Sequence, residues 1–253
     1  MARVTWKAWC LALKAMERKS WLARGMAAVV TGGGSGIGEA IARRLTAEGV
    51  RVAALSRSAA GGGDGNTEPW PVACDVRDEL SIQAAVDAAA GRFGRVDILV
   101  NAAGVSMPEF REISRIDPEL WRRLVDTNMT GLFLMTRACM PLLSRSGGFI
   151  LNILSTAAFR GMVGNAPYTA SKYGARAVSE TAALEGKEKG VRVSSISPGP
   201  VDTNIWSHKT VPPAAEKREL MLDPEDIADI ALFLLKTPEY VVIDNMTVTP
   251  MHF

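Results

Sequence analysis

The clearest chemical pair in the sequence is a tyrosine four residues before a lysine, Tyr168 and Lys172 in the segment Tyr-Thr-Ala-Ser-Lys. The surrounding pattern is helical, and positions i and i+4 share one helical face, so both side chains project together. A free phenol has a pKa of about 10, too high for acid–base work at neutral pH. A neighbouring ammonium group lowers that pKa and would fit Tyr168 for proton transfer. Such a pair also arises by chance, so it needs support from other residues.

A glycine-rich segment forms a second candidate site. Thr31–Gly38 reads Thr-Gly-Gly-Gly-Ser-Gly-Ile-Gly, follows a predicted strand and enters a predicted helix. There, glycines permit a tight turn and a close approach of the backbone to a pyrophosphate, which the free N–H groups of the helix N-terminus bind. A flexible glycine-rich loop is the alternative. The residues expected to contact the phosphates are Gly32, Gly34, Ser35, Gly36, Ile37 and Gly38.

The spacing Thr-Gly-x-x-x-Gly-x-Gly differs from the GxGxxG fingerprint and resembles that of the short-chain dehydrogenase/reductase family. The resemblance covers about residues 22–249 and is nearest to compact NADP-dependent carbonyl reductases. It implies an α/β fold: a single-domain Rossmann fold whose doubly wound parallel sheet has seven strands.

The same resemblance implies four catalytic residues, Asn128, Ser155, Tyr168 and Lys172. Ser155 ends a predicted strand, residues 149–154, at the family's spacing from the tyrosine. It would orient the carbonyl oxygen that Tyr168 protonates as hydride arrives. Lys172 would lower the pKa of Tyr168 and hold the nicotinamide ribose, and Asn128 would position a water that links Lys172 to solvent. An ordinary strand-end hydroxyl and a structural amide are the alternatives for Ser155 and Asn128.

The end of the second predicted strand, residues 51–55, bears on the choice between NAD and NADP. An acidic residue there hydrogen-bonds the ribose 2′-hydroxyl of NAD and repels a 2′-phosphate. This chain has Ser56, Arg57 and Ser58 instead, and no acid. Arg57 can form charge-assisted bonds with the 2′-phosphate, and either serine can add a hydroxyl. We therefore predict NADP (NADPH) as the cofactor; the alternative is that Arg57 is a solvated surface arginine.

Further cofactor contacts follow from the resemblance. Asp75 and Val76 match the pair that contacts adenine, although Asp75 could equally cap a turn. The segment 101–104, Asn-Ala-Ala-Gly, matches a family motif that binds the cofactor and stabilises the sheet. Position 102 departs from that motif: the family more often has asparagine there, and this chain has alanine. The turn after the sixth strand is expected to contact the nicotinamide carboxamide. The full set comprises Asp75, Val76, Asn101, Ala102, Ala103, Gly104, Tyr168, Lys172, Pro198, Gly199, Val201 and Thr203.

Short apolar strands alternate with longer amphipathic stretches, which indicates repeated βα units and a parallel sheet. The predicted strands cover residues 27–31, 51–55, 72–74, 96–100, 149–154, 191–196 and 241–249. The predicted helices cover residues 36–49, 79–92, 118–143 (one broken or two adjacent helices), 167–188 and 224–235. The carboxyl ends of the strands would gather the candidate residues at one edge of the sheet.

Composition narrows the remaining possibilities. The net charge is +2, with 29 Lys and Arg against 27 Asp and Glu, which gives no reason to expect nucleic acid as a partner. The longest apolar runs, 131–136 and 230–235, are too short to span a bilayer, so no membrane partner is predicted. Three dispersed cysteines favour a reducing, cytoplasmic location, and the presence of only two histidines argues against a metal site.

The chain is expected to form one domain, residues 21–253, after an N-terminal extension, residues 1–20. That extension is basic and contains tryptophan. A transit peptide and a membrane-surface helix are compatible with it, but we favour an extra extension that arises from an early start codon. Residues 200–222 match the family's variable substrate lid.

The predicted function is that of an NADP(H)-dependent oxidoreductase acting on a small-molecule carbonyl or secondary alcohol. A non-catalytic or regulatory cofactor-binding protein is one alternative, and an epimerase or dehydratase that retains the tyrosine is another. Because Ser155, Tyr168 and Lys172 are all present, the oxidoreductase is favoured over the binding protein. Two long helices, 128–144 and 167–188, are expected to pair copies into a homodimer or homotetramer. The residues expected to form that interface are Leu132, Leu134, Met135, Ala138, Leu142, Ala175, Val178, Ala182 and Ala183.

Overall fold

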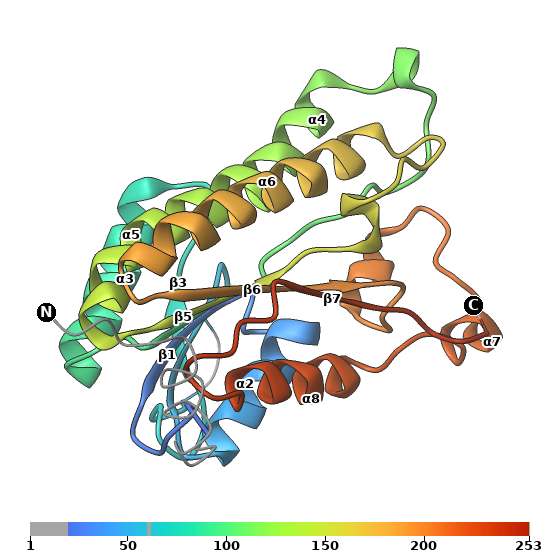
Figure 1. Cartoon of the computed structure of the whole chain (residues 1–253). Coiled ribbons are helices and arrows are strands. Elements are labelled where there is room, and N and C mark those ends of the chain that lie inside the picture. Colours follow the sequence, from blue (N-terminus) through green and yellow to red (C-terminus); the bar gives the residue numbers. More distant parts are fainter. Residues whose placement is uncertain (1–19, 60–61, 253) are drawn as a thin grey trace, which may run out of the picture.

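Seven parallel strands form one sheet in the computed structural model, which describes residues 20–59 and 62–252 (Figure 1). Their spatial order is β3-β2-β1-β4-β5-β6-β7. The bounds are β1 Ala27–Thr31, β2 Arg51–Ser56, β3 Trp70–Ala73, β4 Ile98–Asn101, β5 Phe149–Ile153, β6 Arg192–Pro198 and β7 Asn245–Val248. The order reverses direction between β1 and β4, where doubly wound sheets open a crevice at their carboxyl edge. The predicted fold class is confirmed.

Helices cover both faces of the sheet (Figure 1). Helices α2 (Gly36–Ala47) and α8 (Pro224–Leu235) pack together on one face, and α3 (Glu79–Phe93), α5 (Gly131–Ser146) and α6 (Ala166–Glu188) lie on the other. Every residue of β1 and β5 is buried, as expected for a parallel sheet covered on both sides. Two apolar cores result, one under each helical layer.

The predicted break in the helix over 118–143 is a single wide turn. Helix α4 (Pro118–Val125) continues into a π-helical turn, Asp126–Thr130, and then into α5. Extra residues inserted as π turns in helices often occur at functional sites. Two short helical segments, η4 (Asn204–His208) and α7 (Ala215–Arg218), lie within the predicted lid. The lid is otherwise irregular.

The predicted bounds of every strand after β1 differ from the observed ones, and two of these differences have a clear local cause. The third strand begins at Trp70 and contains Pro71, which is tolerated because β3 is an edge strand and needs no second row of hydrogen bonds. Trp70 is fixed there by an edge-on contact with Phe93, at 6.1 Å between ring centroids. The seventh strand is only Asn245–Val248, since Val241 is held in a turn by a hydrogen bond from its N–H to the carbonyl of Pro238.

A buried arginine joins the start of the described chain to its C-terminal part. Arg192, at the start of β6, lies with its guanidinium 4.8 Å from the ring centroids of both Trp21 and Phe149. Its Nη1 donates to the carbonyls of Pro238 and Val241, each at 3.2 Å. Burial lowers the pKa of Arg192 to about 10. The chain is therefore part of the fold from at least Trp21, while residues 1–19 of the predicted extension lie outside the described residues.

None of the described helices has the length and apolar character needed to cross a lipid bilayer.

Candidate active site

The glycine-rich turn between β1 and α2 has no room for side chains. Gly32 has a φ of +66°, and a Cβ on it would lie 2.9 Å from the backbone nitrogen of Ala103. A Cβ on Gly38 would collide with the carbonyl oxygen of Gly32. The backbone of the turn is thus folded tightly against β4 and presents the first N–H groups of α2 to the crevice. This is the cradle that a pyrophosphate requires.

The turn is fastened to the end of β4 by a residue that the sequence analysis had not assigned. Thr31 accepts hydrogen bonds at its Oγ1 from the backbone N–H groups of both Ala102 and Ala103, at 3.1 Å each. The Asn101 side chain turns into the core instead and donates to Asn152 Oδ1 at 2.9 Å. This supports a sheet-stabilising role for Asn101, and a contact with a cofactor would have to come from its backbone.

Ser155, Tyr168 and Lys172 come together at the carboxyl end of β5. Ser155 begins a short turn there, and Tyr168 lies in the first turn of α6, where its phenol hydrogen-bonds Ser155. The Lys172 ammonium lies 5.9 Å from the centroid of the Tyr168 ring and donates to the carbonyl of Ile153 at 3.1 Å. The spacing read from the sequence therefore produces one cluster, with Lys172 buried beneath Tyr168.

The pKa of Tyr168 differs from the lowered value that the sequence predicts. Burial raises the pKa of Tyr168 above its usual value, and the hydrogen bond with Ser155 offsets only part of that rise. Burial also lowers the pKa of Lys172 to about 8. The expected lowering of the tyrosine pKa by Lys172 is therefore not found, because desolvation has the largest effect on the phenol.

Asn128 occupies the middle of the π turn and is 2% exposed. Its side chain clamps the backbone of Val105: Oδ1 accepts from the Val105 N–H at 2.8 Å and Nδ2 donates to the Val105 carbonyl at 2.9 Å. Nδ2 also donates to Ser171 Oγ at 3.0 Å, and that hydroxyl donates to the carbonyl of Tyr168 at 2.7 Å. Ser171 thus couples Asn128 to the tyrosine turn, a role that the sequence pattern did not reveal.

The carboxyl ends of β2 and β3 carry the residues expected to choose between NAD and NADP. Ser56 Oγ donates to the carbonyl of Ser58 at 3.0 Å, and Arg57 is exposed. Asp75 is held by Arg77 in a two-point ion pair, which lowers the pKa of Asp75 to about 2. The charge of Arg57 acts in the same direction. Two arginines and one already paired carboxylate therefore face this part of the crevice.

The segment after β6 closes the other side of the glycine-rich turn. The Thr203 Cβ is 3.1 Å from the position that a Cβ on Gly36 would take, so the two segments touch. Gly199 is tied to β7 through its N–H, which donates to the carbonyl of Val248 at 2.7 Å. Val201 and Val76 are both buried in the apolar cores, so a cofactor could reach only their backbones. The glycine-rich turn thus meets the segments that end or follow β2, β4 and β6.

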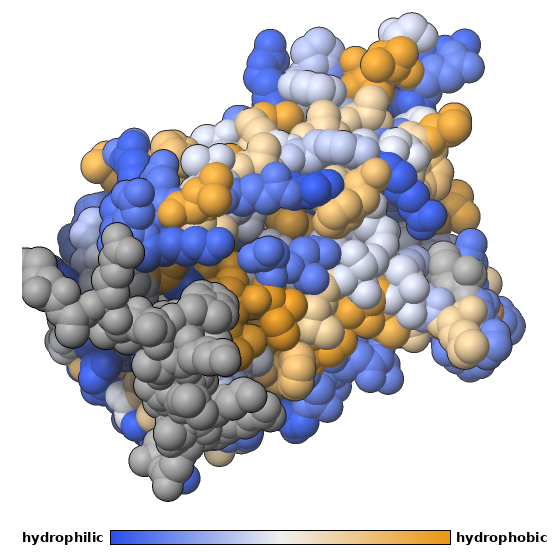
Figure 2. Space-filling model, in the orientation of Figure 1, coloured by the Kyte–Doolittle hydropathy of each residue, from blue (hydrophilic) through white to orange (hydrophobic). Residues whose placement is uncertain are grey.

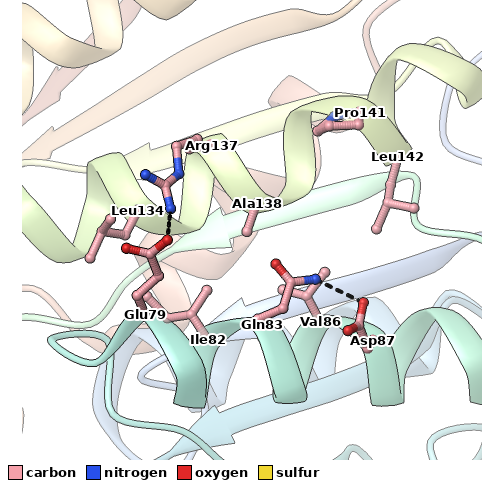
Figure 3. A pocket seen from close by; sticks show the side chains of 10 residues that line it. All are labelled: Glu79, Ile82, Gln83, Val86, Asp87, Leu134, Arg137, Ala138, Pro141 and Leu142. Atoms are coloured by element: carbon pink, nitrogen blue, oxygen red, sulfur yellow. Dashed lines mark hydrogen bonds and ion pairs between the residues drawn. The ribbon is translucent and has the colours of Figure 1, made fainter.

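A separate groove of about 300 Å³ lies between α3 and α5, away from Tyr168 (Figure 3). An ion pair between Arg137 and Glu79 crosses one end of it. Ile82, Val86 and Leu134 contribute apolar side chains to its lining. It contains none of the residues that the sequence analysis assigned to catalysis or cofactor binding.

Comparisons with known proteins agree with this arrangement. The family model described as short chain dehydrogenase matches residues 26–212. A D-threitol dehydrogenase of Mycolicibacterium smegmatis is 38% identical over 226 residues, which cover 83% of this chain and 85% of that protein. An uncharacterised oxidoreductase of Staphylococcus epidermidis is 33% identical, covering 88% of this chain and 96% of that protein.

Solved structures share the fold over nearly their full length. The 3-ketoacyl-(acyl-carrier-protein) reductase from Brucella melitensis complexed with NADH has a TM-score of 0.80 and 31% identity, covering 90% of this chain and 98% of that one. An alcohol dehydrogenase from Thermococcus sibiricus complexed with 5-hydroxy-NADP has a TM-score of 0.80 and 28% identity, covering 90% of this chain and 97% of that one. With its seven-stranded sheet, glycine cradle and matching sequence over most of its length, this chain belongs to the short-chain dehydrogenase family of nicotinamide-dependent oxidoreductases.

Proposed function

We propose that this chain is an NADP(H)-dependent oxidoreductase that moves a hydride between nicotinamide and a carbonyl or secondary alcohol, with Tyr168 as general acid and base. The observation that carries the proposal is the cluster of Ser155, Tyr168 and Lys172, in which the phenol is hydrogen-bonded on one side and lies near an ammonium on the other. A bound nicotinamide supplies or accepts the hydride.

The side chains of the cluster divide the remaining work. The Ser155 hydroxyl lies beside the phenol and can hold a substrate oxygen next to the Tyr168 proton. Tyr168 gives its proton to that oxygen in reduction and takes it back in oxidation. Lys172, buried below, is placed to bind the ribose of the cofactor and to stabilise a phenolate. Asn128 keeps the loop at Val105 and the turn of Tyr168 in fixed relation through its three hydrogen bonds.

NADP is favoured over NAD by the charges at the ends of β2 and β3. Arg57 is exposed there, and no acidic residue follows β2 among Ser56, Arg57 and Ser58. Asp75, which follows β3, is paired with Arg77 and would repel a 2′-phosphate only weakly. The two solved relatives carry different nicotinamide cofactors, so the choice depends on this chain's own residues.

The D-threitol dehydrogenase relative suggests the size of the substrate. By its name it acts on a small polyol, and it is 38% identical to this chain. We therefore propose a small, hydroxylated alcohol or the matching ketone as substrate for this chain.

We also propose that the protein forms a homodimer or homotetramer through α5 and α6. The outward side of these helices carries large apolar side chains, Phe133, Tyr173 and Leu184, which are 45%, 43% and 68% exposed. A two-fold pairing of these faces would cover them. The expected interface residues need correction, because Leu132, Met135, Ala175 and Ala182 are buried within the single chain. Phe133 and Leu184 take their place in the proposal.

Replacing Tyr168 by phenylalanine tests the catalytic role directly. Tyr168→Phe keeps the ring but removes the transferable proton, so carbonyl reduction should fall by at least about 100-fold, the lower end of the usual contribution of a general acid. NADPH binding, followed by quenching of tryptophan fluorescence, should change little. Tyr240→Phe, at an exposed tyrosine, is the matched control and should keep full turnover. Turnover of Tyr168→Phe within tenfold of the parent would eliminate the proposed role.

A further inference from the structure

The predicted lid contains a lysine that no carboxylate neutralises among the described residues. Lys209 follows η4 and is half-buried. Its ammonium lies 5.0 Å from the ring centroid of Phe110 and 5.7 Å from that of Trp206. Trp206 is itself fixed, because its Nε1 donates to the carbonyl of Val201 at 2.7 Å. The positive charge is therefore held in a defined place between two aromatic rings.

The carboxylates beside these rings are already engaged with arginines. Glu109, next to Phe110, forms an ion pair with Arg111. Asp202, next to Val201, forms an ion pair with Arg218 from α7. Burial lowers the pKa of Lys209, and no counter-charge opposes that effect. An incoming anion stabilises a partly desolvated cation of this kind more than it stabilises a fully solvated one.

Lys209 lies in a lid that contacts segments of the candidate site at two points. One end of the lid touches the phosphate turn through Thr203 and Gly36. The middle of the lid is fastened by the Thr210 N–H, which donates to the carbonyl of Pro108 at 3.0 Å. The loop of Pro108 is in turn bonded to the segment before α6, since the Arg111 N–H donates to the carbonyl of Gly164 at 2.9 Å. Tyr168 lies in the first turn of α6, which follows that segment, so these contacts join the lid to the phosphate turn and to the segment that leads to Tyr168.

The surroundings of this lysine are apolar. Phe110, Met162 and Val163 are all exposed, at 61%, 44% and 99%. Figure 2 shows hydrophobic residues, in orange, at the upper right, where Figure 1 shows the loops that precede α4 and α6. Lys209 is thus a cation held against the ring of Phe110, and Phe110 itself lies against Gly164, in the loop that carries Met162 and Val163.

We propose that Lys209 is a specificity-determining residue that binds an anionic group of the substrate, a carboxylate or phosphate remote from the reacting carbonyl. The inference rests on the proposed hydride transfer at Tyr168 and narrows its substrate class to hydroxylated carbonyl compounds that carry a negative charge. The uncharged polyol named for the relative would then be a poorer substrate for this chain than its charged counterpart.

Matched charged and neutral substrates test this with NADPH. The first pair is dihydroxyacetone phosphate and dihydroxyacetone; the second is a series of oxo acids of increasing chain length, each compared with its methyl ester. For the parent protein, kcat/KM should favour the charged member of at least one pair by about tenfold or more, as expected for a charge-assisted contact. Lys209→Met keeps the packing stem against Phe110 and Trp206 and should abolish that preference, mainly through KM. Lys209→Arg should restore it.

Three outcomes would overturn the inference. Equal charged-to-neutral ratios in the parent and Lys209→Met would mean that the lysine only packs on the aromatic rings. A loss of NADPH affinity in Lys209→Met with an unchanged ratio would assign the cation to a phosphate of the cofactor. Absence of any carbonyl-dependent oxidation of NADPH would remove the proposed function together with this inference, whereas turnover of the neutral substrates alone would leave the proposed function standing.

Discussion

The Asn128 clamp allows a quantitative prediction. Asn128→Ala removes three hydrogen bonds of 2.8, 2.9 and 3.0 Å that join the π turn to Val105 and Ser171. Each is worth about 1 kcal/mol net, and the Val105 backbone groups that stay behind are partly buried. The free energy of unfolding should therefore fall by about 3 kcal/mol. Turnover should fall as well, because Gly104, beside Val105, borders Lys172.

Urea unfolding of the parent and of two variants measures this loss. Ser171→Ala is the matched control, because it removes only one of the three Asn128 bonds and a contact within the first turn of α6. It removes two hydrogen bonds in place of three and should cost about 2 kcal/mol, with the same dependence on urea concentration as the parent. Equal losses for the two variants, or a loss below about 1 kcal/mol for Asn128→Ala, would refute the clamp as the source of stability at this site.

Three further predictions concern the cofactor, the proton and the assembly. The double variant Ser56→Asp with Arg57→Ala should lose its preference for NADPH and gain one for NADH, as measured by titration with both cofactors; equal affinities in the parent would contradict the assignment of Arg57. For carbonyl reduction, kcat/KM should fall as the pH rises above about 8, where Lys172 loses its proton and with it the charge that stabilises a phenolate. Alcohol oxidation should rise only at higher pH, because Tyr168, whose pKa is raised by burial, must lose its proton before it can accept one; a reduction profile that rises with pH would reverse the assigned roles. Light scattering during size exclusion should give two or four times 27.1 kDa for the active protein, and a mass of 27.1 kDa would show a monomer.

The sequence predicted those parts of the site that depend on local spacing. The glycine turn lies between a strand and a helix as expected, and the four-residue interval places Tyr168 and Lys172 on one side of α6. These features follow from helical periodicity and from the short range of a turn. The parallel sheet follows from the alternating pattern, and its seven strands follow from the family resemblance.

Contacts between segments that are distant in the sequence could not be predicted from local spacing. Nothing in the local pattern around Ser171 shows that its hydroxyl meets Asn128, because the partner comes from a π turn in another helix. The apolar residues of α5 looked alike in sequence, yet Leu132 and Met135 face the core while Phe133 faces outward. The pKa of Tyr168 also depends on desolvation by the whole fold, which a comparison of neighbouring charges does not include.

The stacked arginine at the base of the sheet has a consequence for the order of folding. Trp21 and Phe149 cover the Arg192 guanidinium, but the carbonyls that it bonds belong to residues 237–241. A nascent chain that has made β1 to β6 thus holds a cation whose hydrogen-bond acceptors are not yet synthesised. Burying that cation early would be costly, so this end of the sheet is expected to stay open until the segment through Val241 emerges. The last step of folding would then bring the segment through Val241 to Arg192 and Trp21, which lies near the start of the described chain. Because this contact joins residues far apart in the sequence, we expect it to form slowly and after synthesis is complete.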